Sequence, residues 1–160
     1  MRGAIIGVLL GAVLGGAGGF AAGLFAFPLL FPPTPVNATV NEAEAGPVRA
    51  AGTFIHADPS DRVHWGTGTV TAYDGLIHLG ADFEVGPGPK YHVYLVPQRA
   101  IDPDTRVEET MFVDLGLLRA FSGAQGYGIP AGVALQDFGS VVIWCEQLNM
   151  LISPAELSFK

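Results

Sequence analysis

The sequence predicts an all-β fold, an antiparallel β-sandwich domain preceded by one N-terminal transmembrane α-helix. No charged residue occurs between Gly3 and Phe31. Beyond residue 50, short apolar runs alternate with turn residues and show no helical periodicity of useful length. Asp74-Gly75 lies between two such runs, a pattern typical of a two-residue hairpin turn. We therefore expect an anchor at 1–31, a proline-rich linker at 32–50 and a sandwich domain at 51–160.

The first element is a helix over Gly3–Phe27, a stretch of 25 residues. At ~1.5 Å per residue it is about 37 Å long, which is enough to cross a bilayer with some tilt. The apolar run is too long for the usual cleaved signal peptide, although Ala21-Ala22 leaves cleavage as an alternative. We expect a signal-anchor in a single-pass membrane protein.

The charges around this helix predict its orientation. Arg2 and the N-terminal amine precede the helix, whereas Glu42 and Glu44 follow it before the next basic residue, Arg49. The positive-inside rule keeps the basic end in the cytoplasm. We therefore expect the C-terminal domain outside the cytoplasm, either periplasmic or at the cell surface.

Glycine recurs every fourth residue along the helix. The six positions are Gly3, Gly7, Gly11, Gly15, Gly19 and Gly23. In a helix they form one stripe of small residues, where a second helix can approach closely. This glycine zipper favours self-association or a membrane protein partner, beside the membrane contact of residues 3–27. The alternative is that small residues are simply common in anchors.

Prolines end the helix, and strand patterns follow. Phe31-Pro32-Pro33-Thr34-Pro35 cannot continue helical hydrogen bonding, so residues 32–50 are expected to hold the domain off the membrane. The charged segment Asp102–Glu109 is expected to be a solvated loop. The strand candidates are Gly52–Ala57, Thr67–Tyr73, Leu76–Phe83, Tyr91–Pro97, Met111–Leu115, Ser140–Gln147 and Ala155–Phe159.

The apolar run Ser140–Cys145 is expected to be a central strand. In a regular strand, alternate side chains point to opposite faces of the sheet. One face would carry Val141, Ile143 and Cys145, and the other would carry Val142, Trp144 and Glu146. Cys145 would then lie near the end of a buried strand.

Charge and cysteine content narrow the function. The formal net charge is −7, and all 15 acidic residues lie from Glu42 onward, so nucleic-acid binding is not expected. Cys145 is the one cysteine, and it cannot form an intramolecular disulfide. Its thiol is either buried and inert or exposed and available for redox chemistry.

Two segments resemble a known family. They are Phe112–Pro130, which contains Asp114-Leu115-Gly116 and Gly126-Tyr127-Gly128-Ile129-Pro130, and Val141–Gln147, which contains Trp144-Cys145. Together with Gly86–Pro97 they are similar to the DM13 domain, over about residues 52–159. The resemblance implies an extracytoplasmic β-rich module with a role in electron transfer.

In that family a cysteine occupies the position of Cys145, and members occur beside haem-binding DOMON domains. This chain carries no such partner domain, and residues 148–154 depart from the family's aromatic-rich pattern. Because the family cysteine corresponds to Cys145, the resemblance implies a redox role for this residue in the cell envelope. The alternative is a non-catalytic interaction module in which Cys145 is a buried structural residue.

No cofactor follows from the sequence. His56, His64, His78 and His92 match no compact ligand motif, and no metal ligand is assigned. His78 and His92 alternate with apolar neighbours and are expected on solvent faces of strands. No GxSxG or HExxH motif is present, so whether the protein is an enzyme stays open.

Overall fold

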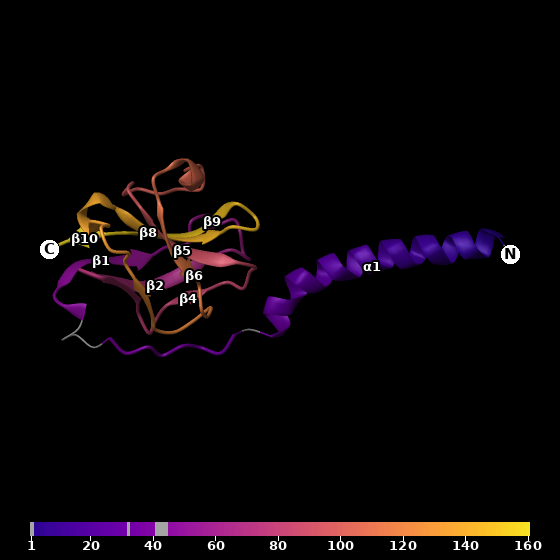
Figure 1. Ribbon diagram of the computed structural model, residues 1–160, viewed down its shortest axis with the longest axis horizontal. Coiled ribbons are helices and arrows are strands. Elements are labelled where there is room, and N and C mark those ends of the chain that lie inside the picture. Colours follow the sequence, from indigo (N-terminus) through magenta and orange to yellow (C-terminus); the bar gives the residue numbers. More distant parts are fainter. Residues whose placement is uncertain (1, 32, 41–44) are drawn as a thin grey trace.

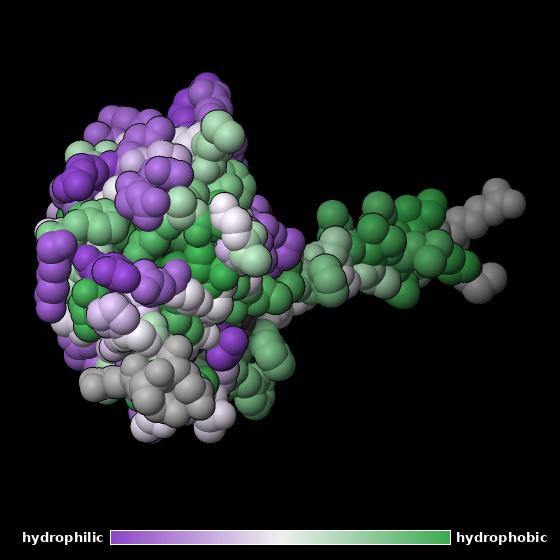
Figure 2. Space-filling view, turned by 60° about the vertical axis from the view of Figure 1, so that its left-hand side comes forward, coloured by the Kyte–Doolittle hydropathy of each residue, from purple (hydrophilic) through white to green (hydrophobic). Residues whose placement is uncertain are grey.

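The computed structural model describes residues 2–31, 33–40 and 45–160. A long helix, α1 (Arg2–Leu30), projects away from a compact β domain (Figure 1). Within α1, Gly3–Leu24 is long and apolar enough to cross a membrane, and none of it is buried against the rest of the chain. The described part of α1 is apolar over its surface in Figure 2. One candidate membrane-spanning helix is therefore present near the N-terminus, as single-pass anchoring requires.

The domain consists of two antiparallel sheets, which confirms the predicted fold class. The larger sheet has the order β10-β1-β2-β3-β7, with β4 also pairing with β2, and the smaller sheet has the order β6-β5-β8-β9. Two short 3₁₀ helices, η1 (Val107–Glu109) and η2 (Leu135–Asp137), lie between strands. The strands are β1 (Val48–Phe54), β2 (Gly66–Tyr73), β3 (Leu76–Leu79), β4 (Glu84–Val85), β5 (Tyr91–Val96), β6 (Val113–Leu117), β7 (Gln125–Gly128), β8 (Ser140–Cys145), β9 (Met150–Glu156) and β10 (Ser158–Phe159).

The main core lies between the two sheets and follows the predicted alternation of β8. Val141, Ile143 and Cys145 belong to this core, together with apolar residues of the larger sheet. Val142 and Trp144 point to the opposite face of the smaller sheet. The two faces of β8 are therefore those expected from the sequence.

A second, smaller core covers the outer face of the smaller sheet. The segment predicted to be a solvated loop supplies Val107, which is fully buried, and the neighbouring Ile101 is also buried there. Phe112 stacks on Tyr94 with ring centroids 4.3 Å apart. The loop therefore keeps its charges in solvent while its apolar residues close this face of β5 and β8.

Part of the expected linker lies on the domain. The backbone N–H groups of Val36 and Ala38 donate to the carbonyls of Ser122 (3.3 Å) and Ala124 (2.8 Å). Gly123 adopts a φ of +91° beside this contact, and a Cβ there would collide with the Val36 carbonyl. The segment around Val36 therefore packs against the domain, and β1 begins at Val48, inside the range expected to be linker.

Candidate functional site

Cys145 is the last residue of β8 and lies opposite Tyr91 of β5. The residue is fully buried, and its thiol donates a hydrogen bond to the Pro89 carbonyl at 3.1 Å. Burial raises the pKa of the Cys145 thiol, although the backbone N–H groups of Leu148 and Gln147 act in the opposite direction. The site therefore favours the protonated thiol over the nucleophilic thiolate.

Tyr91 places a phenol next to this thiol. Its hydroxyl is buried and makes no hydrogen bond within the described part of the chain. Burial, and then the charge of a neighbouring Cys145 thiolate, raise the pKa of Tyr91. Two oxidisable side chains, Tyr91 and Cys145, are thus neighbours on adjacent strands. The two residues are far apart in the sequence, so no local pattern predicts that they meet.

The turn before β5 covers both side chains. Gly88 packs so closely on the Tyr91 ring that it leaves no space for a Cβ. Lys90, at the end of the turn, has a φ of +51°, in the left-handed region that costs a non-glycine residue about 1–2 kcal/mol. Such strained residues recur where a segment has to move or to hold a reactive group.

An apolar groove of about 760 Å³ lies on the outer side of this turn. The end of α1 contributes Leu24 and Phe27, and the domain contributes Gly88, Pro89 and Phe121. Pro89 therefore lines the groove and also accepts the hydrogen bond from Cys145. A single residue, Pro89, therefore contacts both the thiol and a groove that lies between the domain and the end of α1.

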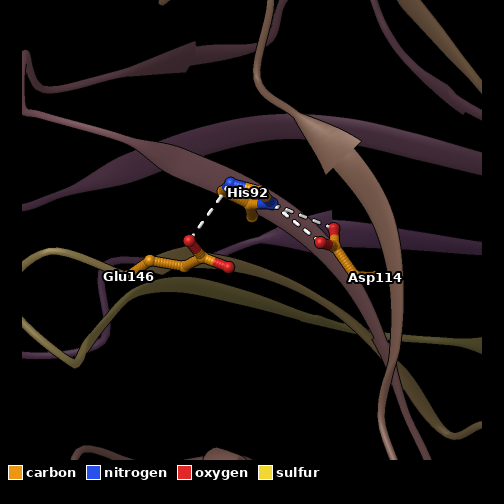
Figure 3. Close-up of side chains that lie close together, drawn as sticks. All are labelled: His92, Asp114 and Glu146. Carbon is orange, nitrogen blue, oxygen red and sulfur yellow. Dashed lines mark hydrogen bonds and ion pairs between the residues drawn. The ribbon is translucent and has the colours of Figure 1, made fainter.

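A second cluster consists of His92, Asp114 and Glu146 (Figure 3). They come from β5, from β6 and from the residue that follows β8. His92 Nδ1 lies 3.0 Å from both carboxylate oxygens of Asp114, and Nε2 lies 3.5 Å from Glu146 Oε2. The apolar neighbours of His92 predicted a solvent-facing side chain, but His92 is only 9% exposed because the outer face of β5 is covered. That expectation was wrong.

Glu146 also contacts Lys90 and Tyr94. The ammonium group of Lys90 lies 2.6 Å from Oε2, and the Tyr94 hydroxyl donates to Oε1 at 3.1 Å. The hydrogen bond from Lys90 is the main cause that lowers the pKa of Glu146. Burial, and then the bond to Glu146, raise the pKa of Tyr94. A pocket of about 280 Å³ adjoins this cluster.

The other three histidines do not join the cluster. The His56 ring forms a hydrogen bond with the Asp61 carbonyl (2.7 Å), and the His64 ring forms one with the Asp61 carboxylate (2.7 Å). The His78 ring forms a hydrogen bond with the Ala38 carbonyl (3.2 Å). Among the described residues, only His92, Asp114 and Glu146 form a group with metal-ligand spacing. Local sequence spacing does not reveal the group, because its members are brought together by strand pairing.

These features define a β-sandwich protein whose N-terminal helix can anchor it in a membrane. The family model described as "Electron transfer DM13" matches residues 58–157. The chain therefore belongs to the DM13 family, as its resemblance predicted. No curated protein and no solved structure matches the chain.

Proposed function

We propose that this protein is a membrane-anchored, extracytoplasmic DM13 protein that takes part in electron transfer in the cell envelope, with Cys145 as its redox group. Family membership supports the electron-transfer role. The orientation is supported by Arg2 before α1 and by the acidic residues that follow it. The apolar helix supports attachment of the domain to a membrane.

The position of the Cys145 thiol beneath the Gly86–Lys90 turn carries this proposal. The thiol is bonded to Pro89, and Pro89 lines the groove next to the end of α1. Displacement of the turn exposes the thiol, which loses its proton to water. The thiolate then attacks a disulfide of a partner protein, so that the partner S–S bond breaks and a mixed disulfide forms. The leaving sulfur of the partner takes up a proton and is reduced.

Thiol labelling of the full-length protein in detergent micelles tests this role. A maleimide is added at neutral pH to the native protein, and the labelling rate is compared with that of the urea-denatured protein. We expect slow but complete labelling of Cys145 in the native state, as well as formation of a mixed disulfide with an added low-molecular-weight disulfide. Cys145→Ser is the negative control. Labelling that occurs only after denaturation contradicts the redox role.

The orientation needs a separate measurement. A C-terminal epitope tag is added, and intact cells or outward-facing vesicles are treated with an external protease. We expect loss of the tag without lysis, after permeabilisation of an outer membrane where the host has one. A tag that is protected until the inner membrane is broken contradicts the extracytoplasmic position.

A second candidate function is a non-catalytic interaction module that binds another envelope protein. The complete burial of Cys145 and the raised pKa of its thiol favour this alternative, because a buried free cysteine then acts as a small core residue. The glycine stripe of α1 would supply the contact within the membrane. In that case, Cys145→Ala leaves partner capture unchanged, whereas substitutions in the glycine stripe reduce it.

A further inference from the structure

We propose that His92 and Glu146 bind a divalent transition-metal ion and that Asp114 orients the imidazole for this role. The three side chains come from separate strand segments and place ligand atoms within 4.8 Å of one another. This site is distinct from Cys145, and the proposal does not depend on the redox role of that residue.

The hydrogen bond to Asp114 determines which nitrogen of His92 is free. A carboxylate can only accept a hydrogen bond, so Nδ1, which lies 3.0 Å from both Asp114 oxygens, carries a hydrogen. Nε2 is then the coordinating nitrogen. This arrangement of carboxylate, histidine and metal is how proteins commonly orient a metal-binding imidazole.

The surroundings of Nε2 suit a bound cation. The atom is buried and forms no hydrogen bond within the described residues, while Glu146 Oε2 lies 3.5 Å away. A lone pair on Nε2 and a negatively charged oxygen repel each other, and a cation bound to both atoms would replace this repulsion by two attractive contacts. Burying such an arrangement without compensation costs free energy.

The separation of these two atoms fits a tetrahedral metal. Ligands about 2.1 Å from a zinc ion and about 109° apart are about 3.4 Å from each other. The observed distance between Nε2 and Oε2 is 3.5 Å. An ion can therefore bridge the two atoms with little movement of β5 or β8. The adjoining pocket, about 280 Å³ in volume, leaves room for solvent or another small ligand at the remaining coordination positions.

The ligand types favour a transition metal over calcium or magnesium. Imidazole nitrogen suits Zn²⁺, Cu²⁺, Fe²⁺ and Ni²⁺, whereas Mg²⁺ and Ca²⁺ prefer sites made of oxygen alone. Two direct protein ligands define an open site, and we expect its affinity for divalent ions to follow the order Cu²⁺ above Zn²⁺.

Lys90 competes with the metal for Glu146. Its ammonium group lies 2.6 Å from the same Oε2 atom, but the side chain is 55% exposed and can turn into solvent. Lys90 thus supplies a single positive charge in the absence of metal. Removing this charge while keeping an apolar side chain, as in Lys90→Met, is expected to tighten Zn²⁺ binding about threefold to tenfold.

The test is a titration of metal-free, full-length protein in detergent with Zn²⁺, in competition with a chromophoric chelator. We expect one equivalent to bind, with a Kd at least tenfold weaker in Glu146→Gln and in His92→Gln. Asp114→Asn should weaken binding about 10–100-fold, because the amide no longer holds the His92 ring as the carboxylate does. His78→Gln is the matched control and should leave the Kd for Zn²⁺ unchanged. In a second control, Ca²⁺ in place of Zn²⁺ should not bind to the site.

A spectroscopic measurement identifies the ligand directly. With one equivalent of Cu²⁺, electron paramagnetic resonance should show coupling to one imidazole nitrogen, and this coupling should vanish in His92→Gln. Circular dichroism establishes that each variant is folded. Absence of stoichiometric binding to the folded protein would overturn the proposal. Binding that is lost in His78→Gln but retained in Glu146→Gln would overturn it as well.

Discussion

Replacing the buried Gln125 by leucine should destabilise the domain far more than removing the neighbouring tyrosine hydroxyl. Gln125 Oε1 accepts hydrogen bonds from the N–H groups of Arg119 (3.1 Å) and Ala120 (3.1 Å) and from the Tyr127 hydroxyl (2.9 Å). Its Nε2 donates to the Ala120 carbonyl at 2.8 Å. Gln125 is fully buried and Ala120 nearly so, so water cannot replace these bonds.

The size of the effect follows from the groups left without partners. Gln125→Leu leaves the N–H and the carbonyl of Ala120 unsatisfied, at about 1–3 kcal/mol each, for a total of about 2–6 kcal/mol. The Arg119 N–H retains the Tyr127 hydroxyl, 3.2 Å away. Tyr127→Phe removes one donor, while Oε1 keeps its two backbone donors, so this change should cost about 1 kcal/mol.

Urea denaturation of the full-length protein in detergent, followed by tryptophan fluorescence, measures both free energies of unfolding. A small domain is typically stable by about 5–15 kcal/mol, so Gln125→Leu removes a large share of the total. Equal losses for Gln125→Leu and Tyr127→Phe would refute this reasoning, as would a loss below about 1 kcal/mol for Gln125→Leu.

Three further predictions concern acid stability, thiol protection and helix association. Burial disfavours the Asp61 carboxylate, but hydrogen bonds from His64 and Val63 outweigh it and lower the pKa of Asp61 from 3.8 to about 2. The carboxylate therefore contributes stability above about pH 4 that is lost as the pH falls from about 4 to about 2, and Asp61→Asn should flatten the unfolding free energy measured over that range. Gly88→Ala should speed maleimide labelling of native Cys145 at least tenfold, because the added methyl group displaces the turn from Tyr91; an unchanged rate would show that this turn does not protect the thiol. Gly11→Leu should abolish chemical cross-linking between copies in membranes if the glycine stripe forms the contact, whereas Leu10→Ala, on another side of the helix, should not.

The strands that sequence analysis found are those with a clear apolar signal. β5 and β8 were predicted because both are almost wholly apolar, and the hairpin at Asp74-Gly75 between β2 and β3 was predicted from its turn. β7 (Gln125–Gly128) was missed because three of its four residues are glycine or glutamine, which carry no apolar signal. Gln125 is buried because its side chain forms hydrogen bonds with the backbone of a loop.

β9 was misplaced for a different reason. The sequence predicted a strand from Ala155, but the structure begins it at Met150 and includes Pro154. An interior strand forms hydrogen bonds with a neighbour on each side. A proline has no N–H to donate to either neighbour, so it is rare in such a strand. β9 is the edge of the smaller sheet, and among the described residues only β8 pairs with it as a strand in that sheet. On its other side the Pro154 carbonyl accepts a single hydrogen bond from the Ile55 N–H (3.0 Å), so the N–H that proline lacks is not needed there.

The candidate sites were predictable only in part. Cys145 stood out as the single cysteine, and its place at the end of a buried strand was expected. Its neighbour Tyr91 and the cluster of His92, Asp114 and Glu146 depend on how β5, β6 and β8 pair. Register between strands is set by long-range packing, so these neighbours cannot be found from local spacing.

The contact of Val36 with the domain limits how far the domain can move from the end of α1, the candidate membrane-spanning helix. The chain between Leu30 and Val36 can extend no more than about 20 Å at ~3.3–3.6 Å per residue. While this contact holds, the domain can rotate above the lipid but cannot sweep a wide volume. Molecules held in the same membrane as α1 would meet the domain at a frequency that depends on their number per unit area, whereas dissolved molecules would meet it in proportion to their concentration.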